Sequence, residues 1–337
     1  MLALTTMSTS PGLALIGPRS PRLVTQWARA AERAGLGSVW FIEDYFQPGA
    51  YALAGAAAAV TERVGIGLGV VNPFTRHPAL LAMETGALAG LAPGRIILGL
   101  GSSNPGWIRD QMGIPFTAPL GAVRESVEII RRLWAGERLS YAGRRFTLRA
   151  VKLDFPPAQA ALPIWLGVKG PRAVAMAGEI ADGVLCSILC SPGHVRRIRA
   201  STAARPRAFA MAGYIPTLID ADGERARQAI RPFLARYLAF LHGQSLLRDA
   251  GISERETEPI RAAVLAGTPA GHLVTGAMIE QTSIVGTPPE CRAALARWAE
   301  AGLDTPVAVV PPDVSVLEQI TRIGTEIGPF WRELTAP

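Results

Sequence analysis

Cysteine is scarce in this sequence, and long apolar runs are missing. Only three cysteines, Cys186, Cys190 and Cys291, occur in 337 residues, too few for the disulfide framework of a small secreted domain. The longest apolar stretch, 52–60, is far shorter than the ~20 residues that cross a bilayer. The first seventeen residues contain no lysine or arginine, so they lack the basic start of a signal peptide. These absences predict a reduced, cytoplasmic protein without a membrane partner.

Lysine is almost absent as well. The formal net charge is +7, yet only Lys152 and Lys169 are lysines among the 34 basic residues. The arginines are spread along the chain in runs of no more than two, whereas a nucleic-acid-binding face needs clustered basic residues. The charge pattern therefore argues against a nucleic-acid partner and favours a small anionic ligand.

Short apolar runs alternate with alanine-rich helical segments. Most of the runs are continuously apolar, which is typical of parallel strands covered on both faces. We expect eight strands, at residues 12–17, 38–42, 64–71, 95–101, 163–168, 182–188, 207–215 and 306–310. Helices are expected at residues 21–34, 50–62, 78–90, 121–135, 171–180, 223–241 and 289–301. Eight βα units predict one α/β domain over residues 1–337, a (β/α)8 TIM barrel. A doubly wound sheet with a helical domain is the alternative.

Two connections are too long for a simple βα repeat. After strand four, residues 102–162 hold a helix and an expected β-hairpin with its turn at Ala142–Gly143. After strand seven, residues 220–305 carry extra helices around 246–282. Insertions at the ends of barrel strands usually shape a substrate site.

The carboxyl ends of the strands are where a barrel places its site. These ends carry residues 43–48, 69–78, 99–107, 167–171 and 186–192. In GVKGP (167–171), exposed amides, a helix start and one of the two lysines form an arrangement typical of an anion site. GLGSSN is not G-x-G-x-x-G, and the following proline interrupts the helix that a dinucleotide fingerprint needs, so we exclude such a fingerprint.

Four segments together resemble the bacterial luciferase-like family of flavin and deazaflavin oxidoreductases. They are WFIEDYF, GVVNPFTRHP, GRIILGLGSSNPGWIRDQMGIPF and LGVKGPRAVAMAGEIADGVL. The resemblance is strongest to methylenetetrahydromethanopterin reductase-like enzymes, which depend on coenzyme F420. It runs from about residue 12 to residue 193, with a fainter echo at 283–310. The family has a (β/α)8 barrel with an insertion that partly covers the site.

The resemblance implies where a cofactor would lie. It implies a non-prolyl cis peptide at Gly69–Val70, behind the central ring of the cofactor, with Asn72 beside it. The residues that would border the ring or cradle the phosphate are Gly99, Gly101, Ser102, Gly167, Val168, Lys169 and Gly170. Glu43 and Asp44 are the implied catalytic residues: Glu43 has the position of an active-site acid, and Asp44 stands where many relatives have histidine.

The residue types also suit simpler roles. Glu43 and Asp44 would equally cap a helix or pair with an arginine. His77 suits a structural hydrogen bond better than a catalytic base. Among the tryptophans, Trp40 and Trp165 suit the core, whereas Trp107 suits either the core or a ring system. Cys186 and Cys190 lack the clustered histidines of a metal site, so no metal is expected.

The sequence therefore predicts an oxidoreductase that moves a hydride between coenzyme F420 and a small organic substrate. An FMN-dependent reductase or monooxygenase is the first alternative, and a non-catalytic flavin-binding subunit is the second. We expect a homodimer. The segments 107–116 and 246–282 match the family least well, and we expect them to select the substrate.

Overall fold

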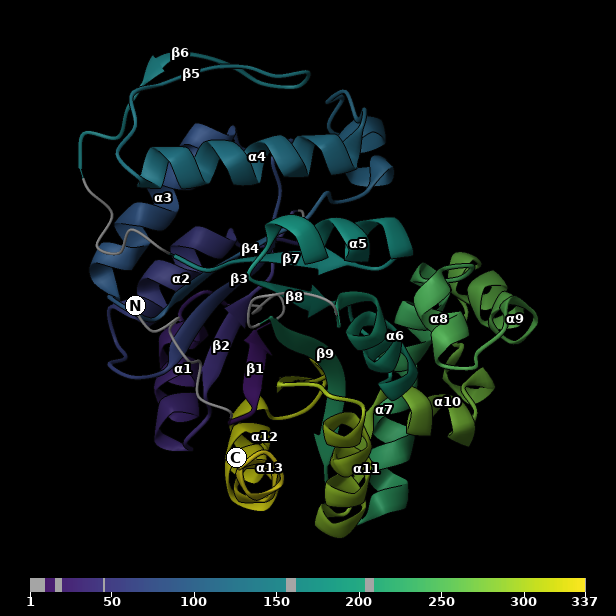
Figure 1. The fold of residues 1–337 in the computed structure, drawn as a ribbon. Coiled ribbons are helices and arrows are strands. Elements are labelled where there is room, and N and C mark those ends of the chain that lie inside the picture. Colours follow the sequence, from purple (N-terminus) through teal and green to yellow (C-terminus); the bar gives the residue numbers. More distant parts are fainter. Residues whose placement is uncertain (1–9, 16–19, 45, 156–161, 204–208, 337) are drawn as a thin grey trace.

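The computed structural model describes residues 10–15, 20–44, 46–155, 162–203 and 209–336. A closed barrel of parallel strands forms its centre (Figure 1). The strands follow each other around it as β1 (Gly12–Leu15), β2 (Ser38–Phe41), β3 (Gly65–Val71), β4 (Ile96–Leu100), β7 (Ile164–Val168), β8 (Gly183–Cys186), β9 (Ala210–Ile219) and β11 (Thr305–Val309). β11 pairs with β1, with Val307 beside Gly12. This closure confirms the TIM barrel and contradicts the doubly wound alternative, because an open sheet would leave its two outermost strands unpaired.

Helices cover the outside of the barrel, and all seven expected helices are present. They are α1 (Leu23–Arg33), α2 (Ala50–Ala58), α3 (Pro78–Leu91), α4 (Pro119–Trp134), α5 (Pro171–Ile180), α7 (Gly223–Phe240) and α11 (Pro288–Glu300). The helix expected to reach residue 62 ends at Ala58. The carboxylate of Glu32 accepts hydrogen bonds from the backbone N–H groups of residues 62, 63 and 64, which holds this stretch out of the helix.

Some elements depart from the prediction. α6 (Pro192–Thr202) and the C-terminal α12 (Val316–Arg322), η3 (Ile323–Ile327) and α13 (Gly328–Leu334) were not expected. β9 runs four residues beyond the expected end, and its continuation pairs with the short β10 (Ile284–Gly286). Residues 16–17 and 207–208 of two expected strands lie outside the described residues. None of the helices within the described ranges has the length and apolar character needed to cross a bilayer.

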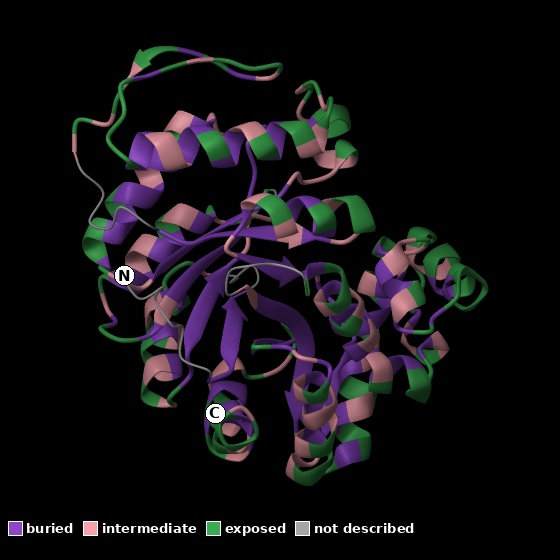
Figure 2. Ribbon diagram, viewed as in Figure 1, coloured by how far each residue is buried: buried purple, intermediate pink, exposed green. Residues whose placement is uncertain are grey.

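Aromatic side chains fill the inside of the barrel. The ring centroids of Trp40 and Trp165 are 5.5 Å apart, and Tyr214 meets Trp40 edge-on at 6.4 Å. A Cβ atom at Gly67 would lie 2.2 Å from the Trp40 ring, so only glycine leaves room for the indole. The tryptophans at 40 and 165 are core residues, as predicted. Figure 2 shows the buried strands surrounded by helices whose outer faces are exposed.

The first insertion contains η1 (Gly106–Gln111), α4 and a hairpin of β5 (Leu139–Ala142) and β6 (Thr147–Val151). The turn predicted at Ala142–Gly143 is longer: the strands are joined by residues 143–146. The carboxylate of Glu125, in α4, accepts hydrogen bonds from the backbone N–H groups of Arg144, Arg145 and Phe146. These bonds fasten the four-residue loop to α4. A two-residue turn would be too short to make them.

The second insertion follows β9. It begins with α7 and continues through α8 (Ser245–Asp249), α9 (Glu254–Leu265), η2 (Gly271–Leu273) and α10 (Gly276–Thr282). Figure 1 shows α8, α9 and α10 grouped beside the barrel, with α8 next to α6. The later helices of the insertion, α8 to α10, therefore pack against α6 and α7.

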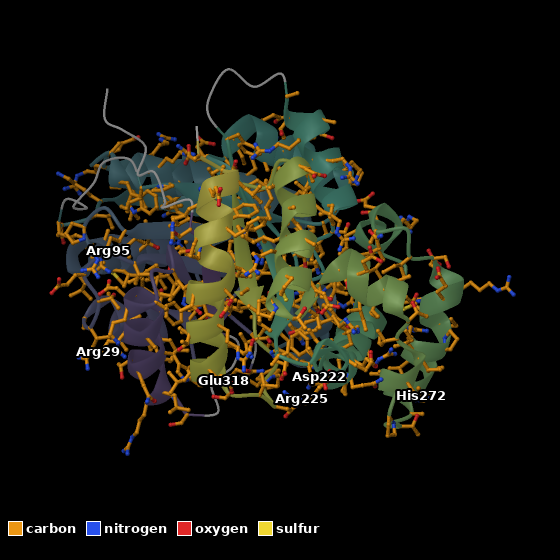
Figure 3. The ribbon with its side chains drawn as sticks, turned by 90° about the horizontal axis from the view of Figure 1, so that it is seen from below. Arg29, Arg95, Asp222, Arg225, His272 and Glu318 are labelled. Atoms are coloured by element: carbon orange, nitrogen blue, oxygen red, sulfur yellow. The ribbon has the colours of Figure 1, made fainter. Side chains whose placement is uncertain are left out.

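At the amino ends of the strands, a charged side chain has a structural role. Arg95, labelled in Figure 3, donates hydrogen bonds to the carbonyl oxygens of Val64 at 3.1 Å and Thr61 at 2.9 Å. These bonds join the start of β4 to the start of β3. Because parallel strands share one direction, this end of the barrel is opposite the expected site.

Candidate functional site

A cavity of about 390 Å³ opens where the strands end. Glu43, Asn72, Ser102, Lys169 and Ser187, which follow five different strands, all line it. The structure thus brings together the side chains that the sequence placed at a common mouth. The fold makes this possible because all the strands of a parallel barrel end on the same side.

Nearly all of the proposed site residues line this cavity. They are Glu43, Asp44, Gly69, Val70, Asn72, Gly101, Ser102, Gly167, Val168, Lys169 and Gly170. Gly99 is the one proposed site residue that does not line the cavity. A Cβ atom at Gly99 would lie 2.0 Å from the carbonyl oxygen of Leu68, so this glycine allows β4 to pack against β3 and does not reach the cavity.

The peptide bond between Gly69 and Val70 is cis, which confirms the prediction from the family resemblance. The Gly69 carbonyl oxygen accepts a 2.7 Å hydrogen bond from the hydroxyl of Tyr214. The Val70 side chain crosses toward the neighbouring strands: a Cβ at Gly101 would lie 2.6 Å from it, and one at Gly167 would lie 2.9 Å from it. These two glycines therefore make room for Val70, in addition to opening the strand ends to a ligand.

Asn72 shapes the loop that follows β3. It is 3% exposed, and its side-chain oxygen accepts hydrogen bonds from the backbone N–H groups of Phe74 at 2.9 Å and Thr75 at 3.1 Å. Farther along the same loop, His77 caps α3 by accepting a 3.2 Å hydrogen bond from the N–H of Ala79. His77 is thus a structural residue, as the sequence suggested.

Glu43 is held by an arginine. Nη1 of Arg76 lies 2.5 Å from each carboxylate oxygen of Glu43, whose side chain is 8% exposed. Nε of Arg76 lies 3.2 Å from Glu84, so the guanidinium bridges two carboxylates. Both oxygens of Glu43 face a cation, which is the simpler role that its residue type left open and which makes it poorly suited to pass on a proton.

Asp44 has a different environment. Burial raises the pKa of its carboxyl group, and among the described residues no cation or hydrogen-bond donor contacts that group. Burial, followed by the charge of Asp44, raises the pKa of the Tyr237 phenol to about 12. Asp44 is therefore the better placed of the two acids to hold a proton at the cavity.

Lys169 is the only cation among the described residues that line the cavity. Its ammonium lies 5.3 Å from the centre of the Phe240 ring, and burial lowers its pKa. The next residue, Gly170, is the N-cap of α5, and Pro171 is its first residue. A half-buried ammonium beside a helix N-terminus, with no carboxylate paired to it among the described side chains, is suited to an anion.

Two aromatic residues from different insertions meet over the cavity. Trp107, in η1, and Phe240, at the end of α7, stack with ring centroids 6.2 Å apart and an angle of 19° between the rings. Segment 107–116 thus contributes one lining residue, and its role in selecting the substrate stays a prediction. Segment 246–282 contributes none of the lining residues, whereas Tyr237 and Phe240, near the end of α7, do line the cavity. Their spacing of three residues, on one face of a helix, was the signal available in the sequence.

The cysteines show no sign of a metal site. Cys186, Cys190 and Cys291 are buried and free. A hydrogen bond with Cys186, together with burial, raises the pKa of Cys190. Within the described ranges, no three or more histidine, cysteine, aspartate or glutamate residues are grouped to hold a metal ion.

Comparison with known proteins identifies relatives of the whole chain. The sequence profile of the luciferase-like monooxygenase family matches residues 2–305. The chain is 32% identical over 320 residues to a 5,10-methylenetetrahydromethanopterin reductase of Methanolobus tindarius, covering 92% of this chain and 97% of that protein. It is 35% identical over 181 residues to an F420-dependent glucose-6-phosphate dehydrogenase of Beutenbergia cavernae, covering 50% of this chain and 53% of that protein.

A solved structure extends the likeness to three dimensions. The coenzyme F420-dependent tetrahydromethanopterin reductase from Methanopyrus kandleri superposes with a TM-score of 0.87 and 26% identity, over 96% of this chain and 99% of that one. These relatives are enzymes, which argues against the non-catalytic flavin-binding subunit considered above. This chain is accordingly an enzyme that belongs to the luciferase-like monooxygenase family.

Proposed function

We propose that the chain is an oxidoreductase that binds coenzyme F420 and transfers a hydride between this deazaflavin and a small organic substrate. The observation that carries the proposal is the arrangement at Lys169, where a half-buried ammonium and the start of α5 lie at the cavity. The F420 dependence of the two relatives named for it supports the choice of cofactor.

The residues fit a cofactor that has a flat ring and a phosphate. The backbone at Gly69–Val70, which accepts a hydrogen bond from Tyr214, offers a support for a ring. Lys169 and the amides of residues 167–170 offer charge and hydrogen bonds to a phosphate. When bound, the deazaflavin supplies the hydride chemistry, and the protein binds, orients and excludes water.

Asp44 is proposed to move the proton that accompanies hydride transfer. A carboxyl group whose pKa is raised by burial holds its proton closer to neutral pH, where it is useful as a general acid. Glu43, through Arg76, is proposed to fix the loop that carries both acids.

An FMN-dependent reductase or monooxygenase is the alternative. FMN also combines a tricyclic ring with a phosphate, so the same cavity and the same lysine suit it. The two cofactors are distinguished by titrating the purified protein with each and recording absorbance, fluorescence and heat. We expect micromolar or tighter binding of F420 and no tight binding of NAD. Binding of FMN alone would favour the alternative, and binding of neither would contradict the proposed function.

We also propose a cytoplasmic, single-domain protein over residues 1–337 that forms a homodimer through α2 and α3. These helices pack against each other, and Glu84 is the only charged residue in either of them. Glu84 forms an ion pair with Arg76 of the same chain, so its charge already has a partner. Leu80, Met83 and Leu91 point outward and are 47%, 42% and 61% exposed.

An apolar outer face of this kind is typical of a helix that is buried. Because one copy of the chain leaves the face uncovered, we assign the covering surface to the same face of a second copy, which a two-fold axis would bring together.

A further inference from the structure

The second insertion contacts residues 167–170, the loop proposed to bind the phosphate, at one carbonyl group. The carbonyl oxygen of Lys169 accepts a 3.1 Å hydrogen bond from the hydroxyl of Ser245, the first residue of α8. It also lies 3.4 Å from Nη2 of Arg197, in α6, as a second donor. The backbone of the loop is thus held from outside the cavity by two elements that the sequence motif does not include.

Holding this carbonyl fixes the direction of the next amide. In a trans peptide, the C=O of one residue and the N–H of the following residue share a plane and point in opposite directions. The C=O of Lys169 is turned outward to Ser245 and Arg197, so the N–H of Gly170 is turned to the opposite side. Gly170 lines the cavity. The outer contacts therefore determine how the loop presents a donor to an anion.

Arg197 is itself held by α8. Oδ2 of Asp249 lies 2.7 Å from Nε of Arg197 and 2.7 Å from Nδ1 of His194, and His194 is fully buried. A Cβ atom at Gly193 would lie 2.0 Å from the backbone carbonyl oxygen of Asp249. This close backbone contact seats α8 against the first turn of α6, as Figure 1 shows for the two helices.

We infer that Ser245 and Asp249 are positioning residues for the anionic group of the cofactor. Ser245 acts directly on the Lys169 carbonyl, and Asp249 acts on it through Arg197. Neither side chain lines the cavity, so neither touches the cofactor. The inference rests on the proposed function, because it assumes that residues 167–170 bind the phosphate.

The test compares ligands that differ in the phosphate. Two pairs are titrated, each differing by one phosphate: the 5′-phosphate of the F420 deazaflavin with the same deazaflavin lacking it, and FMN with riboflavin. For the wild type and for each variant, the dissociation constant of the phosphate-free ligand is divided by that of the phosphorylated ligand. This phosphate ratio measures how much the phosphate contributes to affinity. The pair used is the one that the wild type binds. The variants are Ser245→Ala and Asp249→Asn. The matched control is Ser253→Ala, which removes a serine hydroxyl from the same insertion, at the N-cap of α9.

We expect Ser245→Ala and Asp249→Asn to lower the phosphate ratio by roughly 3- to 10-fold, as losing one hydrogen bond predicts. Affinity for the phosphate-free ligand should stay unchanged, and Ser253→Ala should keep the wild-type ratio. A wild-type ratio in Ser245→Ala would overturn the inference, even if Asp249→Asn fails to fold. A wild type that binds both members of a pair equally would instead refute phosphate binding by residues 167–170, and the inference with it.

Discussion

The hydroxyl of Tyr214 donates a 2.7 Å hydrogen bond to the carbonyl oxygen of Gly69, from β9 across the barrel to β3. A Cβ atom at Gly69 would lie 2.0 Å from this hydroxyl, so the contact requires glycine. Burial raises the pKa of Tyr214 well above its usual value, which keeps the phenol protonated and able to donate. The backbone that faces the cavity is therefore fixed by a strand far away in the sequence.

Replacing Tyr214 with phenylalanine should destabilise the protein by about 1–3 kcal/mol, because the buried carbonyl of Gly69 loses its donor. The free energy of unfolding in urea measures this. Tyr141→Phe is the control: Tyr141 lies on the hairpin, and its hydroxyl donates an exposed hydrogen bond to Glu128 of α4. Losing this bond should change stability by less than about 0.5 kcal/mol. Equal effects of the two substitutions would show that the bond to Gly69 contributes nothing of its own.

The sequence predicted the parts of the site that lie in one segment each. The apolar strand runs, the glycines after β3 and β7, and Lys169 are local patterns, so their positions at the mouth follow once the barrel is recognised. Tyr214, Tyr237 and Phe240 could not be placed in this way, because their roles depend on which strand or helix they face. The Glu43–Arg76 pair joins residues 33 positions apart, and nothing in either local pattern selects the partner.

The two acids should respond differently to amide substitution. Asp44→Asn should keep cofactor binding and lower the single-turnover rate by roughly 10²-fold or more, as expected for losing a general acid. Glu43→Gln removes the charge that Arg76 pairs with and should reduce melting temperature or cofactor affinity in step with activity. Affinity, melting temperature and rate are measured on each variant.

If Glu43 carries the proton instead, as the family resemblance implied, the pattern reverses. Glu43→Gln would then lose its rate with affinity and melting temperature intact, and Asp44→Asn would stay within about threefold of the wild type.

Asp44 should also make stability depend on pH in the cofactor-free protein. Burial raises its pKa above the reference value of 3.8, so the native state holds this proton more tightly than the unfolded state. Stability from this group is complete below pH 3.8 and is lost as the pH rises through the folded-state pKa. Asp44→Asn removes the buried charge and should be more stable than the wild type at pH 7, with the difference vanishing at acidic pH.

Denaturant titrations across this pH range measure the difference. Asp110→Asn is the control, because Asp110 is an exposed acid whose pKa is lowered, chiefly by its hydrogen bond with Arg109. No gain for Asp44→Asn at pH 7 would show that solvent or a ligand reaches the carboxylate freely.

Replacing Lys169 with methionine should weaken F420 binding by about 1–3 kcal/mol, or roughly 5- to 150-fold, because a charged hydrogen bond to the phosphate is lost. Lys152→Met is the matched control, since it removes the other lysine of the chain, which lies exposed after β6. Isothermal titration at low and moderate salt gives both affinities. Unchanged binding in Lys169→Met would mean that backbone amides alone hold the anion.

The proposed dimer face can be tested with one charge. Leu80, on α3, is 47% exposed, and Leu265, on α9, is 73% exposed, so an aspartate at either position is solvated in a monomer. In a dimer that covers α3, Leu80→Asp would bury an unpaired charge, costing about 3 kcal/mol or more and weakening association by roughly 100-fold. Sedimentation velocity should therefore show a wild-type dimer, a Leu80→Asp monomer with intact cofactor binding, and a Leu265→Asp dimer. A monomeric wild type, or a dimer that tolerates Leu80→Asp, would place the contact elsewhere or remove it, because a buried carboxylate without a partner is not accommodated between apolar helices.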